Sequence, residues 1–207
     1  MTRRVAVVSA GLSEPSSTKL LADLLGSAVD RAFDGAAEVT HVELRPLAHA
    51  ITDATLTGFA SGDLAEALRL IGGADAVVAV TPVFNASFSG LFKGFVDVLE
   101  RGALDGTPVL VAATAGTARH SLVLEHALRP LFSHLHALVV PTAVFAASED
   151  WGSAAGDGGV DAGLRRRIDR AAQELTELVR TRPTTLKHDQ FDRDVAAMGS
   201  FEDLLRG

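Results

Sequence analysis

The 207-residue chain contains no cysteine and no tyrosine, and it has a single tryptophan. The lack of cysteine excludes disulfides, cysteine nucleophiles, thiolate zinc sites and iron–sulfur clusters. Basic residues are outnumbered by acidic ones, and the formal net charge of -7 argues against nucleic acid or an anionic membrane as the main partner. No apolar run reaches the roughly 18 residues that span a bilayer, and the N-terminal residues do not form a signal-peptide pattern. We therefore expect a soluble cytoplasmic protein.

The hydrophobic pattern predicts an α/β fold. Strand-length apolar runs alternate with segments in which apolar residues recur at helical spacing. The runs are mostly continuous, which is typical of parallel strands covered on both faces. They lie at 5–8, 39–44, 76–80, 109–113 and 138–140, and the helical segments at 16–33, 63–71, 89–100, 121–135 and 161–181. This alternation predicts a flavodoxin-like, doubly wound five-stranded parallel sheet of order 2-1-3-4-5 in a three-layer α/β/α sandwich.

Other segments give weaker indications. Asp63 is expected to cap the helix that follows it. The connection at 45–62 is long enough for a short helix or an oligomer contact, and residues 147–160 are expected to form a glycine-rich loop. We assign residues 1–182 to one domain and 183–207 to a tail. The tail's apolar end could dock on the domain or on a second subunit, or stay solvated as an amphipathic segment.

The loop after the first strand is rich in hydroxyls. Ser16, Ser17 and Thr18 stand at the start of the first helix, and Ser9 begins the loop directly after the strand. Amides and the helix dipole at such a position favour an anion. A helix cap needs one hydroxyl, so three in a row predict a phosphate site that requires no charged side chain. Neither GxxxxGK[ST] nor GxGxxG is present in this loop.

The loop after the third strand combines aromatic and small residues. Pro82 is expected to stop the strand and Ser89 to cap the next helix. Phe84 could border a planar ring system, with Asn85 bonding the edge of that ring. The same interpretation applies to Phe88, although its position is equally compatible with packing in the hydrophobic core.

The loop after the fourth strand has no bulky side chain before Arg119. A ligand could approach its backbone closely, and the amides of Gly116 and Thr117 would be free to stabilise charge on a ring. Arg119 and His120 follow at the rim, where they could meet an anionic cosubstrate or remain solvated.

Three segments together resemble the NAD(P)H-dependent FMN reductases. They are Thr81-Pro82-Val83-Phe84 with Ser89-Gly90 and Lys93, the 114–117 turn with Arg119-His120, and the run 125–130. The resemblance is greatest to the reductase components of two-component alkanesulfonate and methanesulfonate monooxygenases, and it extends from the first strand to about residue 145. Glu14 stands in a loop where the family often has arginine, and Phe84 where many members have tyrosine.

The resemblance implies hydride transfer from NADPH or NADH to FMN, with reduced FMN passed to a partner monooxygenase and no catalytic side chain required. It implies a homodimer or tetramer, with His126 in a packing role. The expected cofactor-binding residues are Ser9, Ser16, Ser17, Thr18, Pro82, Val83, Phe84, Asn85, Thr114, Gly116 and Thr117; Arg119 and His120 are expected to contact the nicotinamide nucleotide, and no metal is expected.

Three alternatives remain. A quinone or azo reductase would keep its FMN. An electron-carrier flavodoxin would normally flank the flavin with Trp or Tyr, but this chain has no Tyr, and its single Trp, Trp151, follows the last strand. A hydrolase is disfavoured because neither GxSxG nor HExxH occurs, and the histidines at 120, 126, 134 and 136 do not share a helix face.

Overall fold

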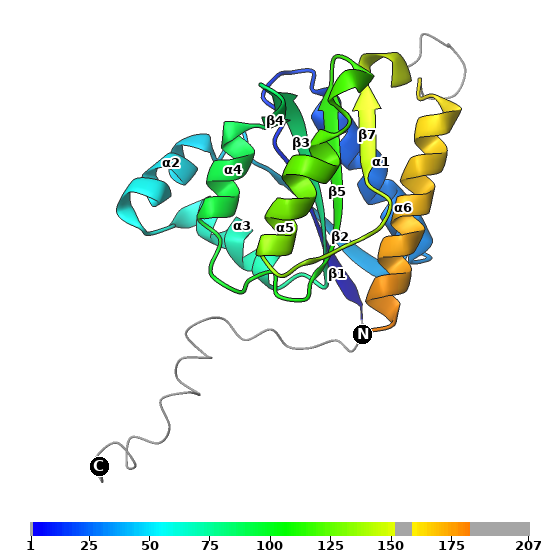
Figure 1. Cartoon of the computed structure of the whole chain (residues 1–207). Coiled ribbons are helices and arrows are strands. Elements are labelled where there is room, and N and C mark those ends of the chain that lie inside the picture. Colours follow the sequence, from blue (N-terminus) through cyan, green and yellow to red (C-terminus); the bar gives the residue numbers. More distant parts are fainter. Residues whose placement is uncertain (1, 152–158, 183–207) are drawn as a thin grey trace.

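The computed structural model describes residues 2–151 and 159–182, and it has a parallel sheet at its centre (Figure 1). The strand order is β2-β1-β3-β5, and β6 and β7 both pair with β5 on its far side. These strands are β1 (Arg3–Ser9), β2 (Ala37–Glu43), β3 (Ala76–Phe84), β5 (Pro108–Ala115), β6 (Leu138–Val139) and β7 (Val144–Ala147). The two-residue strand β4 (Ser87–Phe88) pairs antiparallel with β3. The predicted order 2-1-3-4-5 is therefore confirmed, since β6 and β7 together take the fifth position.

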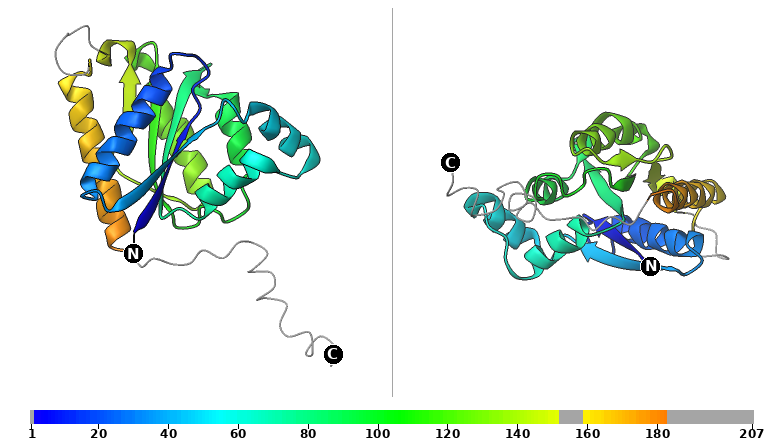
Figure 2. Two further views of the ribbon diagram at one scale, coloured as in Figure 1. Left: turned by 180° about the vertical axis from the view of Figure 1, so that it is seen from behind. Right: turned by 90° about the horizontal axis from the view of Figure 1, so that it is seen from below.

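Helices cover both faces of the sheet, which confirms the three layers (Figure 2). Helices α1 (Ser17–Ala32) and α6 (Ala162–Arg180) lie on one face. The other face is covered by α2 (Ala48–Thr57), α3 (Gly62–Gly72), α4 (Gly90–Asp97) and α5 (Arg129–His134). Helix α2 falls within the long 45–62 connection, as predicted. No helix in the two described ranges is long and apolar enough to cross a bilayer.

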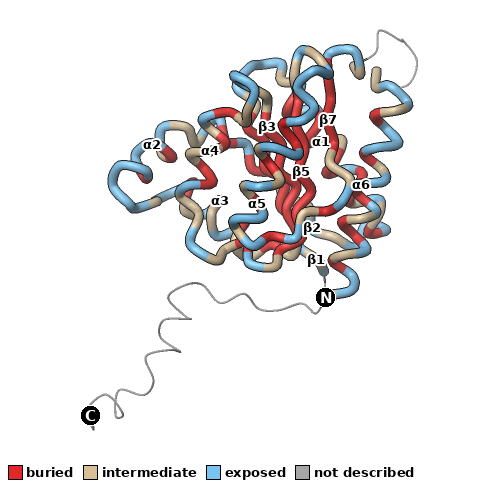
Figure 3. Tube along the Cα trace, viewed as in Figure 1, coloured by how far each residue is buried: buried red, intermediate tan, exposed pale blue. Residues whose placement is uncertain are grey.

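The continuous apolar runs of the strands divide between two cores. Val5 and Val7 of β1 face α1 and α6, whereas Ala6 and Val8 face the opposite helices. Burial on both sides explains why β1, β3 and β5 show no polar alternation (Figure 3).

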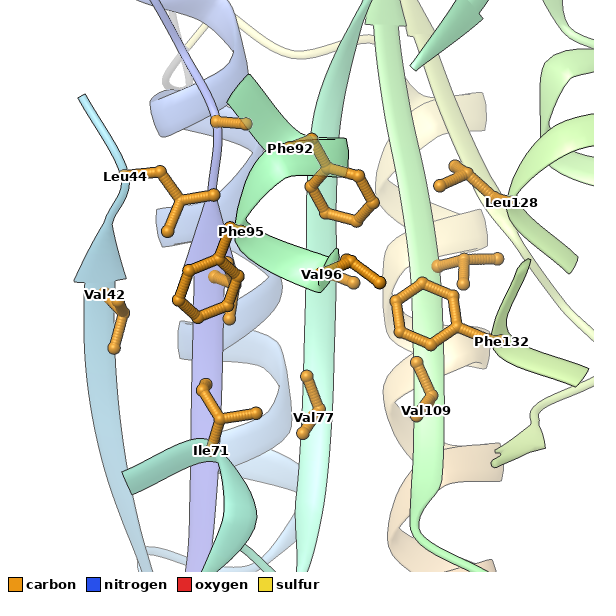
Figure 4. Close-up of a cluster of buried hydrophobic side chains, with 14 of the residues drawn as sticks. Val42, Leu44, Ile71, Val77, Phe92, Phe95, Val96, Val109, Leu128 and Phe132 are labelled. Atoms are coloured by element: carbon orange, nitrogen blue, oxygen red, sulfur yellow. The ribbon is translucent and has the colours of Figure 1, made fainter. Parts of the chain in front are cut away.

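Aromatic rings fill the core beneath α4 and α5 (Figure 4). The ring centroid of Phe92 lies 6.3 Å from that of Phe132 and 6.1 Å from that of Phe88. Phe92 is fully buried and Phe88 half-buried, so Phe88 contributes to packing rather than standing free in its loop.

The segment predicted as one helix at 121–135 is composite. A 3-10 turn at Ala118–His120 is followed by a π-helical turn at Leu124–Leu128, and only then by α5. His126 is exposed on the π-helical turn, so it has no packing role within the protomer.

The expected cap at Asp63 is also wrong, because Ser61 holds the cap position and Asp63 lies in the first turn of α3.

The fifth strand is interrupted between β6 and β7, where only 138–140 was expected to be extended. Proline at position 141 cannot donate to a sheet ladder, which accounts for the break. Arg129 donates to the carbonyl oxygens of Val140 and Pro141 at 3.1 Å each, and its guanidinium also bonds Glu125. The hydrogen bond to Arg129 lowers the pKa of Glu125, which keeps the carboxylate charged.

Glu174 of α6 holds the other side of the same break. Its carboxylate accepts hydrogen bonds of 2.7 Å from both the amide and the hydroxyl of Thr142. Burial raises the pKa of Glu174, but the bonds from Thr142 and Arg170 outweigh burial, so the pKa lies below the usual value.

The depressed pKa of Glu174 predicts a specific loss of stability in acid. A carboxyl group whose pKa is lowered by folding stabilises the protein above its unfolded pKa of about 4.3, and that stabilisation disappears as the pH falls through the folded pKa. Glu174→Gln should therefore lower the free energy of unfolding by about 1.5–3 kcal/mol at neutral pH. Urea melts from pH 7 to pH 3 should show the difference from wild type shrinking below about pH 4.3. A difference that grows with acidification would contradict this assignment.

The 147–160 segment is only partly described. Ser148–Asp150 forms a 3-10 turn rather than open loop, and Trp151 forms an antiparallel bridge with Val160. Residues 152–158 of that predicted loop, and the whole tail from 183, lie outside the described residues.

Candidate functional site

Three loops gather at one edge of the sheet, because β1, β3 and β5 are parallel neighbours and their carboxyl ends coincide. A hydrogen bond of 2.8 Å between the hydroxyls of Thr18 and Thr114 joins the first loop to the third. Both threonines are 3% exposed, so this bond is buried. The sequence predicted both residues as ligand contacts, and the structure shows their hydroxyls bonded to each other, which fixes the two loops relative to each other.

The first loop is folded tightly around Ser16. Ser16 is the N-cap of α1, and its hydroxyl accepts a bond from the amide of Lys19 at 3.2 Å. A Cβ at Gly11 would lie 2.1 Å from the Ser16 hydroxyl oxygen, so a larger residue there would displace that hydroxyl. Ser17 is exposed at the helix start, whereas Ser9 is buried at the end of β1.

The second loop is a β-hairpin, which the sequence analysis missed. The prediction that Pro82 stops the strand is wrong. Pro82 is the last residue of β3 that pairs with β5, after which the strand continues to Phe84 and folds back as β4. Asn85 and Ala86 form the two-residue turn with φ of 48° and 66°. Phe84 is 48% exposed beside this turn, so its side chain is accessible to a ligand.

Two buried hydroxyls attach the hairpin to α4. Thr81 donates to the carbonyl oxygen of Pro82 at 3.0 Å and accepts from the amide of Ser89 at 3.1 Å. Ser89 caps α4, as predicted, by accepting from the amide of Phe92. The role of Thr81 was not predicted, although its position at the end of an apolar strand could have suggested one. Hydrogen bonds of Thr81 and Ser89 therefore hold in place the hairpin that carries Val83 and Phe84.

Ala86 is strained by its left-handed conformation, which favours glycine in this type of turn. We expect Ala86→Gly to raise the free energy of unfolding by about 0.5–1 kcal/mol, because glycine removes the steric cost at positive φ. As a control, Ala65→Gly within α3 should lower it by about 1 kcal/mol. Chemical denaturation of both variants tests the assignment, and destabilisation by Ala86→Gly would refute it.

The third loop exposes backbone rather than side chains. A Cβ at Gly116 would have no atom within 4 Å, and the residue is exposed. Thr117 caps the short 3-10 turn by accepting from the amide of Arg119 at 3.4 Å. Arg119 and His120 are both exposed at the rim, as expected.

Two cations near the first loop are engaged by carboxylates. Arg45, which follows β2, bonds Glu14 at 3.2 Å. The ammonium of Lys19 lies 2.7 Å from Glu43 and 3.6 Å from Asp23. The hydrogen bond to Glu43 raises the pKa of Lys19. Sequence reasoning missed the Arg45–Glu14 and Lys19–Glu43 pairs because each joins residues that are distant along the chain.

These features fit a flavin mononucleotide. The helix start offers amides and hydroxyls to a phosphate, the open space at Gly116 admits a ring edge, and Phe84 offers an aromatic face. In the described residues, no group of three or more His, Asp or Glu side chains is arranged to hold a metal ion.

Comparison with known proteins identifies the family. Residues 3–152 match the family model described as NADPH-dependent FMN reductase. The chain is 39% identical over 151 residues to the NADH-dependent FMN reductase SfnE of Pseudomonas putida, covering 70% of this chain and 77% of that protein. It is 35% identical to an FMN reductase (NADPH) of Pseudomonas aeruginosa, covering 89% and 96%. An oxidoreductase from Corynebacterium diphtheriae superposes with a TM-score of 0.81 and 46% identity, covering 88% and 99%. The chain belongs to the NADPH-dependent FMN reductase family of oxidoreductases.

Proposed function

We propose that this chain transfers a hydride from a reduced nicotinamide nucleotide to FMN and releases the reduced flavin. The convergence of three loops that offer hydroxyls and backbone amides at one edge of the sheet carries this proposal. Family membership supports the reaction type.

Each loop has a distinct task in this proposal. Ser16, Ser17 and the first amides of α1 bind the phosphate, while Ser9 and Thr18 support the loop from beneath. Pro82, Val83, Phe84 and Asn85 border the ribityl chain and ring. Gly116 and Thr117 donate their amides to the pyrimidine edge, with Thr114 positioning them through Thr18. These amides stabilise negative charge that develops there.

FMN, when bound, supplies the hydride-accepting centre, so the chain needs to supply geometry rather than a general base. The residues that would hold the flavin and the nicotinamide would supply most of the rate by orienting the two rings toward each other. Arg119 and His120 are exposed beside the ring position and are assigned to the nicotinamide nucleotide.

A phosphate site that offers only uncharged hydroxyls and amides favours release of the flavin after reduction. No cation near the first loop in the described part is free of a carboxylate partner, so binding should be modest. We therefore place the chain as the source of reduced FMN for a flavin-dependent monooxygenase. A quinone or azo reductase, or a flavodoxin-type carrier, would instead retain FMN.

The same proposal covers assembly and location. Leu122 is 62% exposed on the same stretch of chain as His126, which is also exposed. We propose a homodimer or tetramer built on this segment, working in the cytoplasm. Light scattering should give a dimer or larger, and Leu122→Glu should shift the population toward monomer; a wild-type monomer would contradict this part.

Anaerobic mixing of the protein with excess FMN and either NADH or NADPH tests the reaction. We expect catalytic bleaching of the flavin and reduced flavin that separates from the protein on gel filtration. The relatives named above differ in nucleotide, so comparing kcat/KM for the two nucleotides decides the preference. No bleaching with either would contradict the proposal, and flavin that stays on the protein would favour the retained-FMN alternatives.

A further inference from the structure

The first loop carries a carboxylate where a phosphate is expected to bind. Glu14 lies two residues before the helix cap Ser16, and its side chain is 85% exposed. A carboxylate beside a phosphate dianion weakens binding through like-charge repulsion. Glu14 is therefore unfavourable for phosphate binding unless its charge is offset by a neighbouring cation.

Glu14 is paired with Arg45, which comes from the neighbouring strand. The amide of Leu44 donates to the carbonyl oxygen of Ser9 at 2.9 Å, so the end of β2 is fixed alongside the end of β1. Arg45 follows directly, and its Nη1 lies 3.2 Å from Oε2 of Glu14. The guanidinium is thus anchored beside the first loop but directed to a carboxylate of the protein.

The second cation near this loop is held in the same way. Lys19, in the first turns of α1, bonds Glu43 at the end of β2 and approaches Asp23. Two cations are therefore matched by three carboxylates around the helix start. A phosphate bound as proposed would meet amides and hydroxyls, and the carboxylates would offset its attraction to the two cations.

We propose that Glu14 sets the affinity of the chain for FMN by keeping Arg45 from the flavin phosphate. This inference rests on the proposed function and adds a specificity-determining residue to it. Without Glu14, Arg45 would be free to make charge-assisted hydrogen bonds to the phosphate. FMN would then bind more tightly and leave more slowly, which works against a protein that exports reduced flavin.

The test compares the dissociation constants of FMN and riboflavin, which lacks the phosphate, by flavin fluorescence quenching. Glu14→Gln should tighten FMN roughly three- to tenfold at low salt and leave riboflavin unchanged. Arg45→Gln leaves Glu14 unpaired and should weaken FMN by a similar factor. The double variant should return close to wild type, because neither charge remains.

Asp169→Asn is the matched control. Asp169 of α6 pairs with Arg31 at 3.1 Å, near the end of α1 that lies away from the first loop. Asp169→Asn therefore changes the net charge of the chain as much as Glu14→Gln does, but at a distant position. It should leave both constants unchanged. The tightening by Glu14→Gln should also shrink in about 1 M salt, where the Debye length is about 3 Å. Thermal melts check that each variant is folded.

The outcomes separate this inference from the function on which it rests. If wild type binds and reduces FMN but Glu14→Gln behaves like Asp169→Asn, or tightens riboflavin equally, the inference is wrong and the proposed function stands. If no variant binds FMN, both are overturned.

Discussion

Gly11→Ala is expected to weaken FMN binding roughly 10- to 100-fold. A Cβ at position 11 would lie 2.1 Å from the hydroxyl oxygen of Ser16 and 3.4 Å from Cβ of Thr18. Ser16 must therefore move, and the hydrogen bond that we propose it donates to the charged phosphate, worth about 1.5–3 kcal/mol, would be lost. A difference of about 1.4 kcal/mol corresponds to a factor of ten in affinity.

The same substitution at Gly72 provides the control. A Cβ there would lie 3.9 Å from Ala103, an ordinary contact at the end of α3. Gly72→Ala should leave FMN affinity unchanged. Calorimetric titration of both variants with FMN decides the matter: wild-type affinity in Gly11→Ala would show that the first loop does not bind the phosphate.

Arg129→Met should lower the free energy of unfolding by about 1–3 kcal/mol. The guanidinium donates to two carbonyl oxygens at the break in the fifth strand and to both carboxylate oxygens of Glu125. Methionine fills a similar volume but leaves the part-buried carbonyl oxygen of Val140 without its donor, whereas the half-exposed Glu125 carboxylate is solvated by water.

Two further measurements make this prediction specific. Arg129→Lys keeps the charge but loses the forked geometry, so it should recover only part of the loss. Hydrogen exchange at β6 and β7 should accelerate in Arg129→Met before exchange in β1 does. Urea melts that coincide with wild type would contradict the structural role assigned to Arg129.

The sequence was sufficient for the architecture because each central strand is buried on both faces. Continuous apolar runs such as 76–80 and 109–113 have few alternative interpretations, and the order of strands followed from the alternation with helices. The run 125–130 contributed to the family resemblance, and the structure supplies a physical reason for two of its residues. Glu125 and Arg129 support the interrupted strand.

The errors arise where tertiary contacts override local signals. Pro82 normally ends a strand, but a hairpin attached through Thr81 extends β3 beyond it. The turn at Asn85-Ala86 lacks the glycine that marks such hairpins. The pairs Glu14–Arg45 and Thr18–Thr114 join residues 31 and 96 positions apart, which no local pattern reveals.

The most direct measurement is a titration of the purified chain with FMN, repeated with riboflavin. If hydroxyls and amides at the sheet edge hold the phosphate as well as the ring, one FMN binds per protomer and riboflavin binds distinctly more weakly. Equal affinity for the two flavins, or no detectable binding of FMN, would contradict the account at its foundation.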